Sequence, residues 1–294
     1  METKTKGFLF IILASLCYGV MPALTQTGYK LGLTVPTVLA GRYIFGTLMI
    51  FIFIFIRKKN LKIGKVNIFL LMLVGIDVFV CVNFMSLSYK YVPGAVTSLL
   101  TFLYIVIVNI FMILLGREKL TKLRVICLIL AILGLTLVVY TPGGKIFFDI
   151  RGILFGIGAG VLYAVWAISM GAKRFDKYSP EVVMAFMLII PTLSNIISCI
   201  VNNYPVFPEN FYQWVIVILL ALTPGFIAPV AFCAGVKMIG AGTASLINTS
   251  EPVIVYIVGM VFMGDKMTTS ATFGGILIVL GLILLHFNEM KNKV

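Results

Sequence analysis

Charged residues are scarce in this sequence. Asp, Glu, Lys and Arg make up 11% of the 294 residues, whereas hydrophobic residues make up 61%. A soluble domain usually carries about 25% charged residues. Such a low content leaves too little polar surface to cover a water-soluble globule. The sequence therefore predicts a protein whose solvent is the lipid bilayer.

Acidic residues and histidine are rarer still. The chain has ten Asp and Glu residues and one histidine, His286, so a histidine-based metal site or triad lacks a second imidazole. No glycine-rich loop followed by Gly-Lys-Ser or Gly-Lys-Thr is present to cradle a phosphate. The five cysteines lie singly in apolar runs, without a CxxC pair: Cys17, Cys81, Cys127, Cys199 and Cys233. We expect no metal, no cofactor and no enzymatic activity.

Basic residues outnumber acidic ones, and the formal net charge is +13. They lie in short clusters between apolar stretches, which indicates orientation in a membrane rather than a nucleic-acid partner. With a cytoplasmic N-terminus, 17 of the 23 Lys and Arg residues fall in inside segments, five fall outside, and Arg42 lies within a span. The positive-inside rule then predicts a multi-pass protein of the inner (plasma) membrane with both termini cytoplasmic.

Ten apolar stretches are long enough to cross the bilayer as helices, which takes about 20 residues each. Isolated strands are excluded because lipid cannot satisfy an open sheet edge. The sequence thus predicts an all-α polytopic fold. The predicted spans are 7–28, 34–56, 66–89, 92–115, 121–140, 151–171, 180–201, 211–235, 240–264 and 269–287.

The two halves of the chain repeat one another. A shift of 147 residues places Glu118-Lys119-Leu120-Thr121 on Asp265-Lys266-Met267-Thr268, and a shift of 145 places Tyr18 on Tyr163. Five predicted spans lie in each half, and an odd number makes the second half enter the membrane from the opposite side. Inverted repeats of this kind are typical of transporters. We predict two five-helix repeats, 1–147 and 148–294.

The residues of the two repeats also resemble a known family. In the second half these residues are Ala244-Ser245-Leu246, Glu251-Pro252-Val253, Gly264-Asp265-Lys266-Met267 and Gly274 through Gly281. Their counterparts in the first half are Gly94-Ala95, Ser98-Leu99, Gly116-Arg117-Glu118-Lys119-Leu120 and Gly134. Over essentially the whole chain this pattern resembles the EamA-type transporters of the drug/metabolite transporter superfamily. The chain departs from it at Asp265, where the family more often has Glu, and at Tyr104, which aligns with Glu251.

The resemblance implies a ten-helix basket of five plus five helices around a central cavity, which exports or imports small metabolites. It does not identify the metabolite. A membrane-embedded enzyme acting on a lipid-linked substrate is the alternative, although the clustered acidic or histidine residues that such an enzyme needs are missing. A passive channel fits an inverted repeat less well than alternating access does.

Three ionisable residues lie within predicted spans, where a charge is costly and usually faces a cavity or a partner: Arg42, Asp77 and Glu251. Asp77 and Glu251 lie roughly 16 Å from the cytoplasmic starts of their spans, and Arg42 roughly 12 Å from the outer side. Glu251 precedes Pro252 and is interpreted as a substrate-contacting or protonatable carboxylate, or as a packing contact. Asp77 contacts substrate or pairs with Arg42 or another helix. Arg42 anchors the outer vestibule or binds a substrate carboxylate.

Polar and aromatic residues within the spans are further candidates for the cavity wall. They are Tyr18, Tyr163, Trp166, Asn83 and Asn248. Tyr18 and Tyr163 align between the halves, so both are expected to face the inversion axis. Interhelical hydrogen bonding is the alternative for each of these side chains.

The charge within the spans also limits the substrate. Arg42, Asp77 and Glu251 together carry −1, whereas a phosphorylated solute would need several basic residues at mid-membrane. The sequence favours an amino acid-like zwitterion, a cation or an amphipathic drug-like solute. Burial of the carboxylates would suit proton coupling, with exchange as the other mode. The sequence does not specify the oligomeric state.

Overall fold

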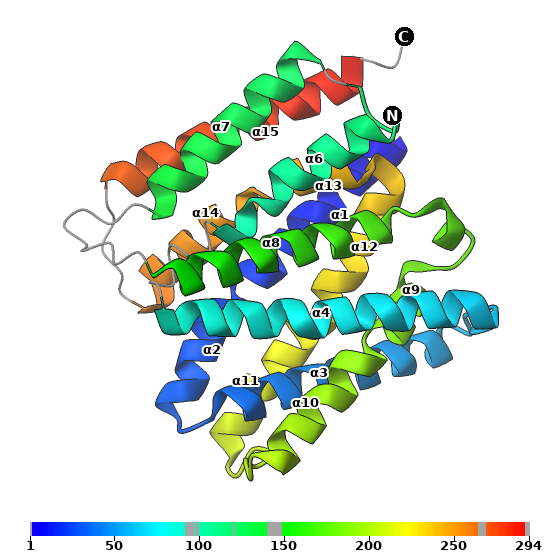
Figure 1. The fold of residues 1–294 in the computed structure, drawn as a ribbon, viewed down its shortest axis with the longest axis vertical. Helices are drawn as coiled ribbons and strands as arrows, with labels where there is room; N and C mark the ends of the chain where they lie inside the picture. The colour runs from blue at the N-terminus through cyan, green and yellow to red at the C-terminus, as the bar shows by residue number, and fades with distance from the viewer. Residues whose placement is uncertain are drawn as a thin grey trace.

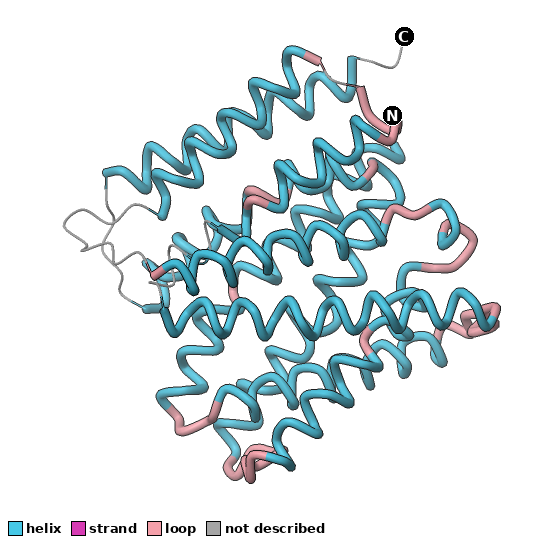
Figure 2. The backbone as a smooth tube through the Cα atoms, in the orientation of Figure 1, coloured by secondary structure: helices cyan, strands magenta, loops and turns pink. Residues whose placement is uncertain are grey.

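The computed structural model describes residues 2–91, 97, 100–119, 121–139, 149–263 and 269–291. Throughout these residues the regular elements are helices, joined by short loops (Figures 1 and 2), which agrees with the predicted all-α class. The helices are α1 Glu2–Gly19, α2 Met21–Lys30, α3 Val35–Ile56, α4 Lys65–Tyr91, α6 Tyr104–Leu114, α7 Lys122–Val139, α8 Ile150–Met170, η1 Lys173–Phe175, α9 Pro180–Met187, α10 Ile189–Val201, α11 Phe211–Leu220, η2 Ala221–Ile227, α12 Ala228–Ile239, α13 Ala241–Ile247, α14 Ser250–Val258, η3 Gly259–Met263 and α15 Thr269–Lys291.

Seven helical stretches of the described chain are long and apolar enough to cross a membrane. Each overlaps one of the stretches predicted from the sequence, and several combine two consecutive helices. Two shorter apolar helices, Leu100–Leu114 and Thr272–Leu284, lie in other predicted stretches. The seven spans are Thr3–Lys30, Val35–Ile56, Lys65–Met85, Ile150–Met170, Pro180–Val201, Phe211–Ile239 and Ala241–Phe262. A total of ten spans remains a prediction.

Proline interrupts some of these spans near their middle. Pro224 lies inside the π-helical turn η2, between α11 and α12, and Pro229 follows in the first turn of α12. Pro22 similarly lies in the first turn of α2, where α1 ends. Proline has no N–H group and clashes with the preceding turn, so it bends the helix and leaves carbonyl groups without their helical partner. Backbone carbonyl groups inside the bundle therefore become available for other hydrogen bonds.

The helices pack in pairs that join the two halves of the chain. Helix α4 lies along α8, α1 along α12, and α7 along α15, while α3 contacts η2 and α10 (Figure 1). The contact of α3 with η2 is close because both carry glycine. A Cβ atom added to Gly46 would lie 2.9 Å from the carbonyl of Gly225. Such close approach between helices is typical of membrane proteins.

Loops that the sequence places on one side of the membrane lie together in the structure. The Tyr178 hydroxyl accepts a hydrogen bond from Asn67 Nδ2 at 2.8 Å, and Lys237 Nζ donates to the carbonyl groups of Phe175 (2.6 Å) and Tyr178 (2.7 Å). The beginning of α1 and the end of α15 lie at this same end of the molecule (Figure 1). At the opposite end, Gln213 Nε2 donates to the carbonyl of Leu31 at 2.9 Å.

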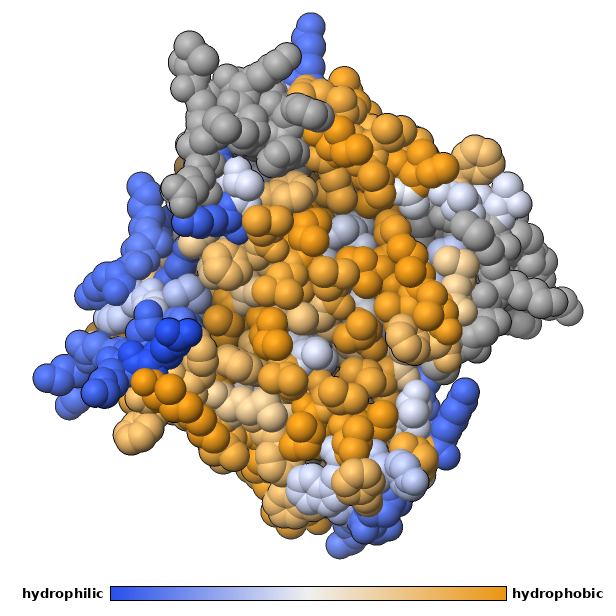
Figure 3. Space-filling view, turned by 180° about the vertical axis from the view of Figure 1, so that it is seen from behind, coloured by the Kyte–Doolittle hydropathy of each residue, from blue (hydrophilic) through white to orange (hydrophobic). Residues whose placement is uncertain are grey.

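The molecular surface has the division expected of a membrane protein. Figure 3 shows a broad hydrophobic face between hydrophilic groups at two opposite edges. Exposed basic residues of the loop between α3 and α4 lie at one of these ends, and they include Arg57, Lys58, Lys59 and Lys62. The apolar face matches a hydrocarbon layer and the basic loops match a headgroup region.

Candidate functional site

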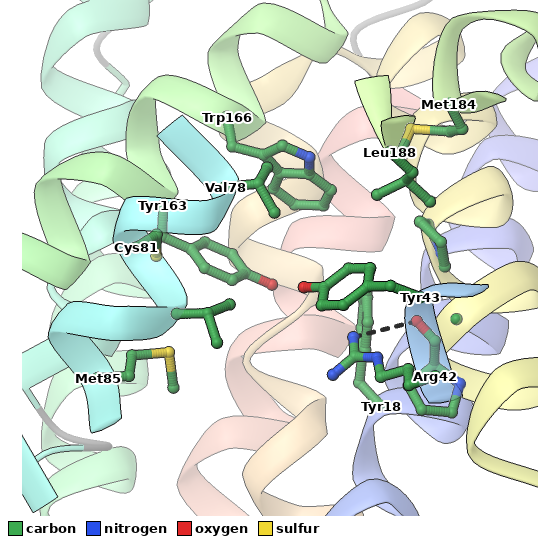
Figure 4. Close-up of a pocket in the computed structure, with 14 residues that line it drawn as sticks. Tyr18, Arg42, Tyr43, Val78, Cys81, Met85, Tyr163, Trp166, Met184 and Leu188 are labelled. Carbon is green, nitrogen blue, oxygen red and sulfur yellow. Dashed lines mark hydrogen bonds between the residues drawn. The ribbon is translucent and has the colours of Figure 1, made fainter. Parts of the chain in front are cut away.

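A cavity lies where helices of the two halves meet (Figure 4). It is lined from α1, α3 and α4 of the first half and from α8, α9, η2 and α12 of the second. Its volume is about 90 Å³, which gives room for several waters. The lining residues are Tyr18, Arg42, Tyr43, Val78, Cys81, Val82, Met85, Tyr163, Trp166, Met184, Leu188, Pro224, Gly225 and Pro229.

Four of the predicted site residues line this cavity: Tyr18, Arg42, Tyr163 and Trp166. The rest of the lining is mainly aliphatic, sulfur-containing or proline side chains. In Figure 4 the hydroxyl groups of Tyr163 and Tyr43 point toward the middle of the cavity. Arg42 is the charged residue of the lining, and no carboxylate lies among these residues. The wall is therefore apolar and aromatic, with a few hydroxyl groups and one cation.

Arg42 is held by weak and neutral acceptors. Its Nη1 atom lies 2.9 Å from Met21 Sδ, and its Nη2 atom donates to the carbonyl of Pro224 at 3.2 Å, the bond that is dashed in Figure 4. The guanidinium carbon lies 5.4 Å from the centre of the Tyr43 ring. The Nε atom is buried and has no hydrogen-bond partner in the described structure. No ion pair of Arg42 is formed with any described carboxylate, Asp77 included.

Local sequence explains the position of Arg42. Thr34 caps α3 by accepting a hydrogen bond from the backbone N–H of Thr37 at 3.3 Å, and a proline lies in the first turn. Helix α3 therefore begins at a defined residue, and Arg42 follows two turns later. The carbonyl of Pro224 is available to it because η2 is a π-helical turn, in which this carbonyl would accept from residue 229, and Pro229 has no N–H group.

A row of four aromatic rings runs along one side of the cavity, and the two middle rings, Tyr163 and Trp166, line it. The ring centres of Tyr104 and Tyr163 are 4.5 Å apart, those of Tyr163 and Trp166 are 5.2 Å apart, and those of Trp166 and Phe232 are 4.8 Å apart. Tyr163 and Trp166 are three residues apart on α8 and so share a face. Contacts at these distances hold the rings in fixed orientations.

Glu251 and Asn248 belong to a polar network behind this wall. Asn248 is fully buried, and its Nδ2 atom lies within hydrogen-bonding distance of both the Tyr104 hydroxyl (3.0 Å) and Glu251 Oε2 (3.1 Å). Its Oδ1 atom accepts a hydrogen bond from Ser15 Oγ at 2.9 Å. Neither residue is among the cavity lining, but Tyr18 lies within electrostatic range of both Glu251 and Arg42. The network connects α1, α6 and α14.

The remaining two predicted residues, Asp77 and Asn83, lie on α4 outside the lining. Asp77 is half-buried one turn before Cys81, and its Oδ2 atom has no hydrogen-bond partner among the described residues. Asn83 is exposed, and its Nδ2 atom donates to the carbonyl of Phe79 in the same helix at 2.8 Å. The structure therefore brings four predicted residues to the cavity and two to the network behind it, and it leaves Asp77 and Asn83 outside both.

Several lining residues were not predicted from the sequence. Tyr43 follows Arg42 directly and gave no separate signal, because an aromatic residue in a span is as readily explained by packing. Met184 and Leu188 lie in continuous apolar runs. Pro224 and Gly225 were detectable, because a Pro-Gly pair inside a span indicates a break in the helix.

The described residues contain no group of three or more His, Cys, Asp or Glu side chains placed to hold a metal ion. All five cysteines are free, and four of them are buried: Cys81, Cys127, Cys199 and Cys233. The expectation that the protein binds no metal or cofactor stays a prediction.

Comparison with known proteins identifies relatives across the chain. A family model described as the EamA-like transporter family matches residues 5–140 and again residues 150–287. An uncharacterized transporter of Archaeoglobus fulgidus is 27% identical over 219 residues, which cover 72% of this chain and 75% of the relative. The uncharacterized transporter YvbV of Bacillus subtilis is 21% identical, covering 99% of this chain and 94% of the relative. One solved crystal structure of a protein has the same fold, with a TM-score of 0.84 at 18% identity and 99% coverage of both chains.

Proposed function

The chain belongs to the EamA-like transporter family, a family of membrane transporters, and from this premise we propose that it moves a small solute across the cytoplasmic membrane by alternating access. The observation that carries the proposal is the cavity at the junction of the two halves, which combines apolar walls with Arg42 and several tyrosines. Ligand sites of secondary transporters lie near mid-membrane between repeats.

An inverted five-plus-five repeat is part of the proposal. The family model matches the chain twice, at 5–140 and 150–287. The helix pairs are also those expected if each span of one half corresponds to the span five places later in the other half. The third predicted span (α4) packs on the sixth (α8), and the corresponding pair, the eighth span (α12) with the first (α1), packs in the same way. The fifth span (α7) packs on the tenth (α15), and these two spans correspond to each other. Such a pattern is expected when two similar bundles are related by a two-fold axis in the membrane plane.

Bends in the helices beside the cavity allow the motion that alternating access requires. The bend at Pro224 lies beside the cavity, and the α9–α10 junction at Leu188 also lines it. A bend at the binding site lets one end of a helix move while the other stays packed. We place both termini in the cytoplasm, since the basic loops share the end of the molecule where α1 begins.

Glu251 and Asp77 are the candidates for proton coupling. Glu251 is hydrogen-bonded to Asn248, and Asp77 has a buried oxygen without a partner in the described structure. A carboxyl group in this environment can be neutral in one state of the transporter and charged in another. Solute uptake that is insensitive to an imposed proton gradient would remove this part of the proposal and leave exchange as the mode.

The test is transport by the purified protein in proteoliposomes. Vesicles are loaded with one member of a panel of amino acids, amines or amphipathic solutes, and counterflow of the labelled solute is followed. We expect saturable counterflow with at least one solute class, abolished in the Pro224→Leu variant and retained in Glu209→Gln, which alters an exposed outer-end side chain. The alternative, an enzyme acting on a lipid-linked substrate, predicts a chemically changed product instead of the intact solute.

A further inference from the structure

Arg42 is a half-buried cation that makes no direct ion pair with a described carboxylate, although Glu251 lies within electrostatic range of it. Two of its N–H groups reach a thioether and one backbone carbonyl, and its Nε group is buried with no acceptor in the described structure. A buried charge without a counter-ion is strongly unfavourable, so charged residues inside a membrane are usually paired or face a ligand. The guanidinium reaches the cavity wall, where a ligand can supply the missing anion.

The remainder of the wall restricts what that ligand is. The lining contains no carboxylate to hold a cationic solute, and most of it is apolar or aromatic. At about 90 Å³ the cavity is smaller than the about 300–1,000 Å³ of pockets for drug-sized ligands. A phosphoryl group carries about two negative charges at neutral pH, whereas Arg42 supplies one positive charge to the lining, which a single carboxylate balances.

We infer that the transported solute is a small carboxylic acid with an apolar side chain, and that Arg42 binds its carboxylate. This inference rests on the proposed function. The two Nη atoms of Arg42, whose acceptors in the structure are a thioether and a backbone carbonyl, are the parallel donors that a carboxylate would accept instead. The apolar body of the solute then packs against Trp166 and Tyr163 on one side and against Val78 and Met85 of α4 on the other.

The two tryptophans of the chain provide a direct binding assay. Trp166 lines the cavity, whereas Trp214 packs against Phe45, with ring centres 5.4 Å apart, and against Phe207 in the loop before α11. The Trp214→Phe variant of the full chain therefore keeps one tryptophan, and that residue reports occupancy of the cavity. Tryptophan fluorescence is titrated in detergent micelles at equilibrium.

The probes are three molecules of one shape and different charge: 3-methylbutanoate, its amide 3-methylbutanamide, and 3-methylbutylamine. We expect saturable binding of the acid and about tenfold to hundredfold weaker binding of the amide, the range for losing hydrogen bonds to a charged group. The amine is expected to bind no better than the amide. Equal affinity for acid and amide, stronger binding of the amine, or no binding of any probe would each overturn the inference.

Variants of Arg42 then test whether this residue makes the distinction. Arg42→Gln is expected to abolish the preference for the acid over the amide, and Arg42→Lys to retain part of it because the charge remains without the fork. Correct folding of each variant is verified by gel filtration and by binding of the amide. A full preference for the acid in folded Arg42→Gln would contradict the role of Arg42.

The outcomes separate this inference from the proposed function. Binding of the acid without counterflow in proteoliposomes would refute transport and leave the carboxylate site standing. Counterflow of amines or neutral solutes, with no competition by 3-methylbutanoate, would support transport and refute the carboxylate site.

Discussion

Replacing Glu118 with alanine removes a side chain that joins the α6–α7 loop to the beginning of α13. Its Oε1 atom accepts hydrogen bonds from the backbone N–H groups of Gly242 at 3.0 Å and Thr243 at 3.4 Å. Its other oxygen pairs with Arg124, whose Nη2 atom also donates to Thr243 Oγ1 at 2.9 Å. Helix α13 begins after Gly240 without a side-chain cap of its own, so Glu118 takes the place of the cap.

The size of the effect follows from these contacts. Loss of an N-terminal cap costs about 0.5–2 kcal/mol, and loss of one partner from a buried ion pair costs about 3–5 kcal/mol. The exposed fractions of the two side chains are 6% for Arg124 and 10% for Glu118, so water relieves the remaining charge only slightly. We therefore expect Glu118→Ala to lower the free energy of unfolding by about 3 kcal/mol. Glu118→Gln keeps an acceptor for the cap and is expected to cost less.

The assay is unfolding in mixed micelles by titration with a denaturing detergent, followed by tryptophan fluorescence. Glu209→Ala is the matched control because Glu209 is exposed in the loop before α11, and a surface substitution usually changes stability by less than about 0.5 kcal/mol. The double variant Glu118→Ala with Arg124→Ala is expected to lose less than the sum of the two single variants, because neither charge is left unpaired. A Glu118→Ala loss no larger than the control, or strict additivity in the double variant, would refute the reasoning.

Three further predictions concern other parts of the chain. Glu251→Gln is expected to remove the dependence of uptake on an imposed proton gradient, measured in proteoliposomes with the gradient reversed as control; unchanged dependence makes Glu251 structural. Gly46→Val is expected to destabilise the bundle by about 1–3 kcal/mol, since its Cβ would lie 2.9 Å from the Gly225 carbonyl, and an unchanged unfolding midpoint would contradict that packing. Hydrogen bonds from Arg151 lower the pKa of Asp149, so this interaction stabilises the fold above the ordinary pKa of the carboxyl and is lost as pH falls through the lowered value; a carboxyl NMR titration at the ordinary pKa would exclude it.

The helical stretches were predictable because lipid leaves the backbone few alternatives. Arg42 was predictable as a cavity residue because charged groups are few in such apolar runs, and Tyr18 and Tyr163 because they align between the two halves. Trp166 is one of two tryptophans in the chain. The side of each helix that faces the cavity was not predictable. Cavity-lining residues of α4 recur at positions 78, 81, 82 and 85, one face of a helix, and Asn83 lies off that face. Packing of α4 against α8 decides which side of α4 faces the cavity, and a single sequence taken by itself does not contain that information.

The repeated Glu-Lys-Leu-Thr block shows what sequence can indicate without explaining. Its recurrence as Asp265-Lys266-Met267-Thr268 indicated a duplication, but not why the acidic residue is present in both copies. In the structure Glu118 accepts hydrogen bonds from two backbone N–H groups at the beginning of α13. The first of them belongs to Gly242, 124 residues later in the chain. Contacts over such a separation have no local signature. The second copy, with Asp265, lies outside the described residues.

The hydrogen bond from Arg42 to the carbonyl of Pro224 connects the binding of a solute in the cavity to the backbone between α11 and α12. The guanidinium holds the backbone at the point where α11 and α12 are separated by a bend. Any anion that draws this side chain toward itself competes with that carbonyl for the same donors. The pocket and the backbone at this bend thus share one side chain, so no longer chain of contacts is needed to connect them.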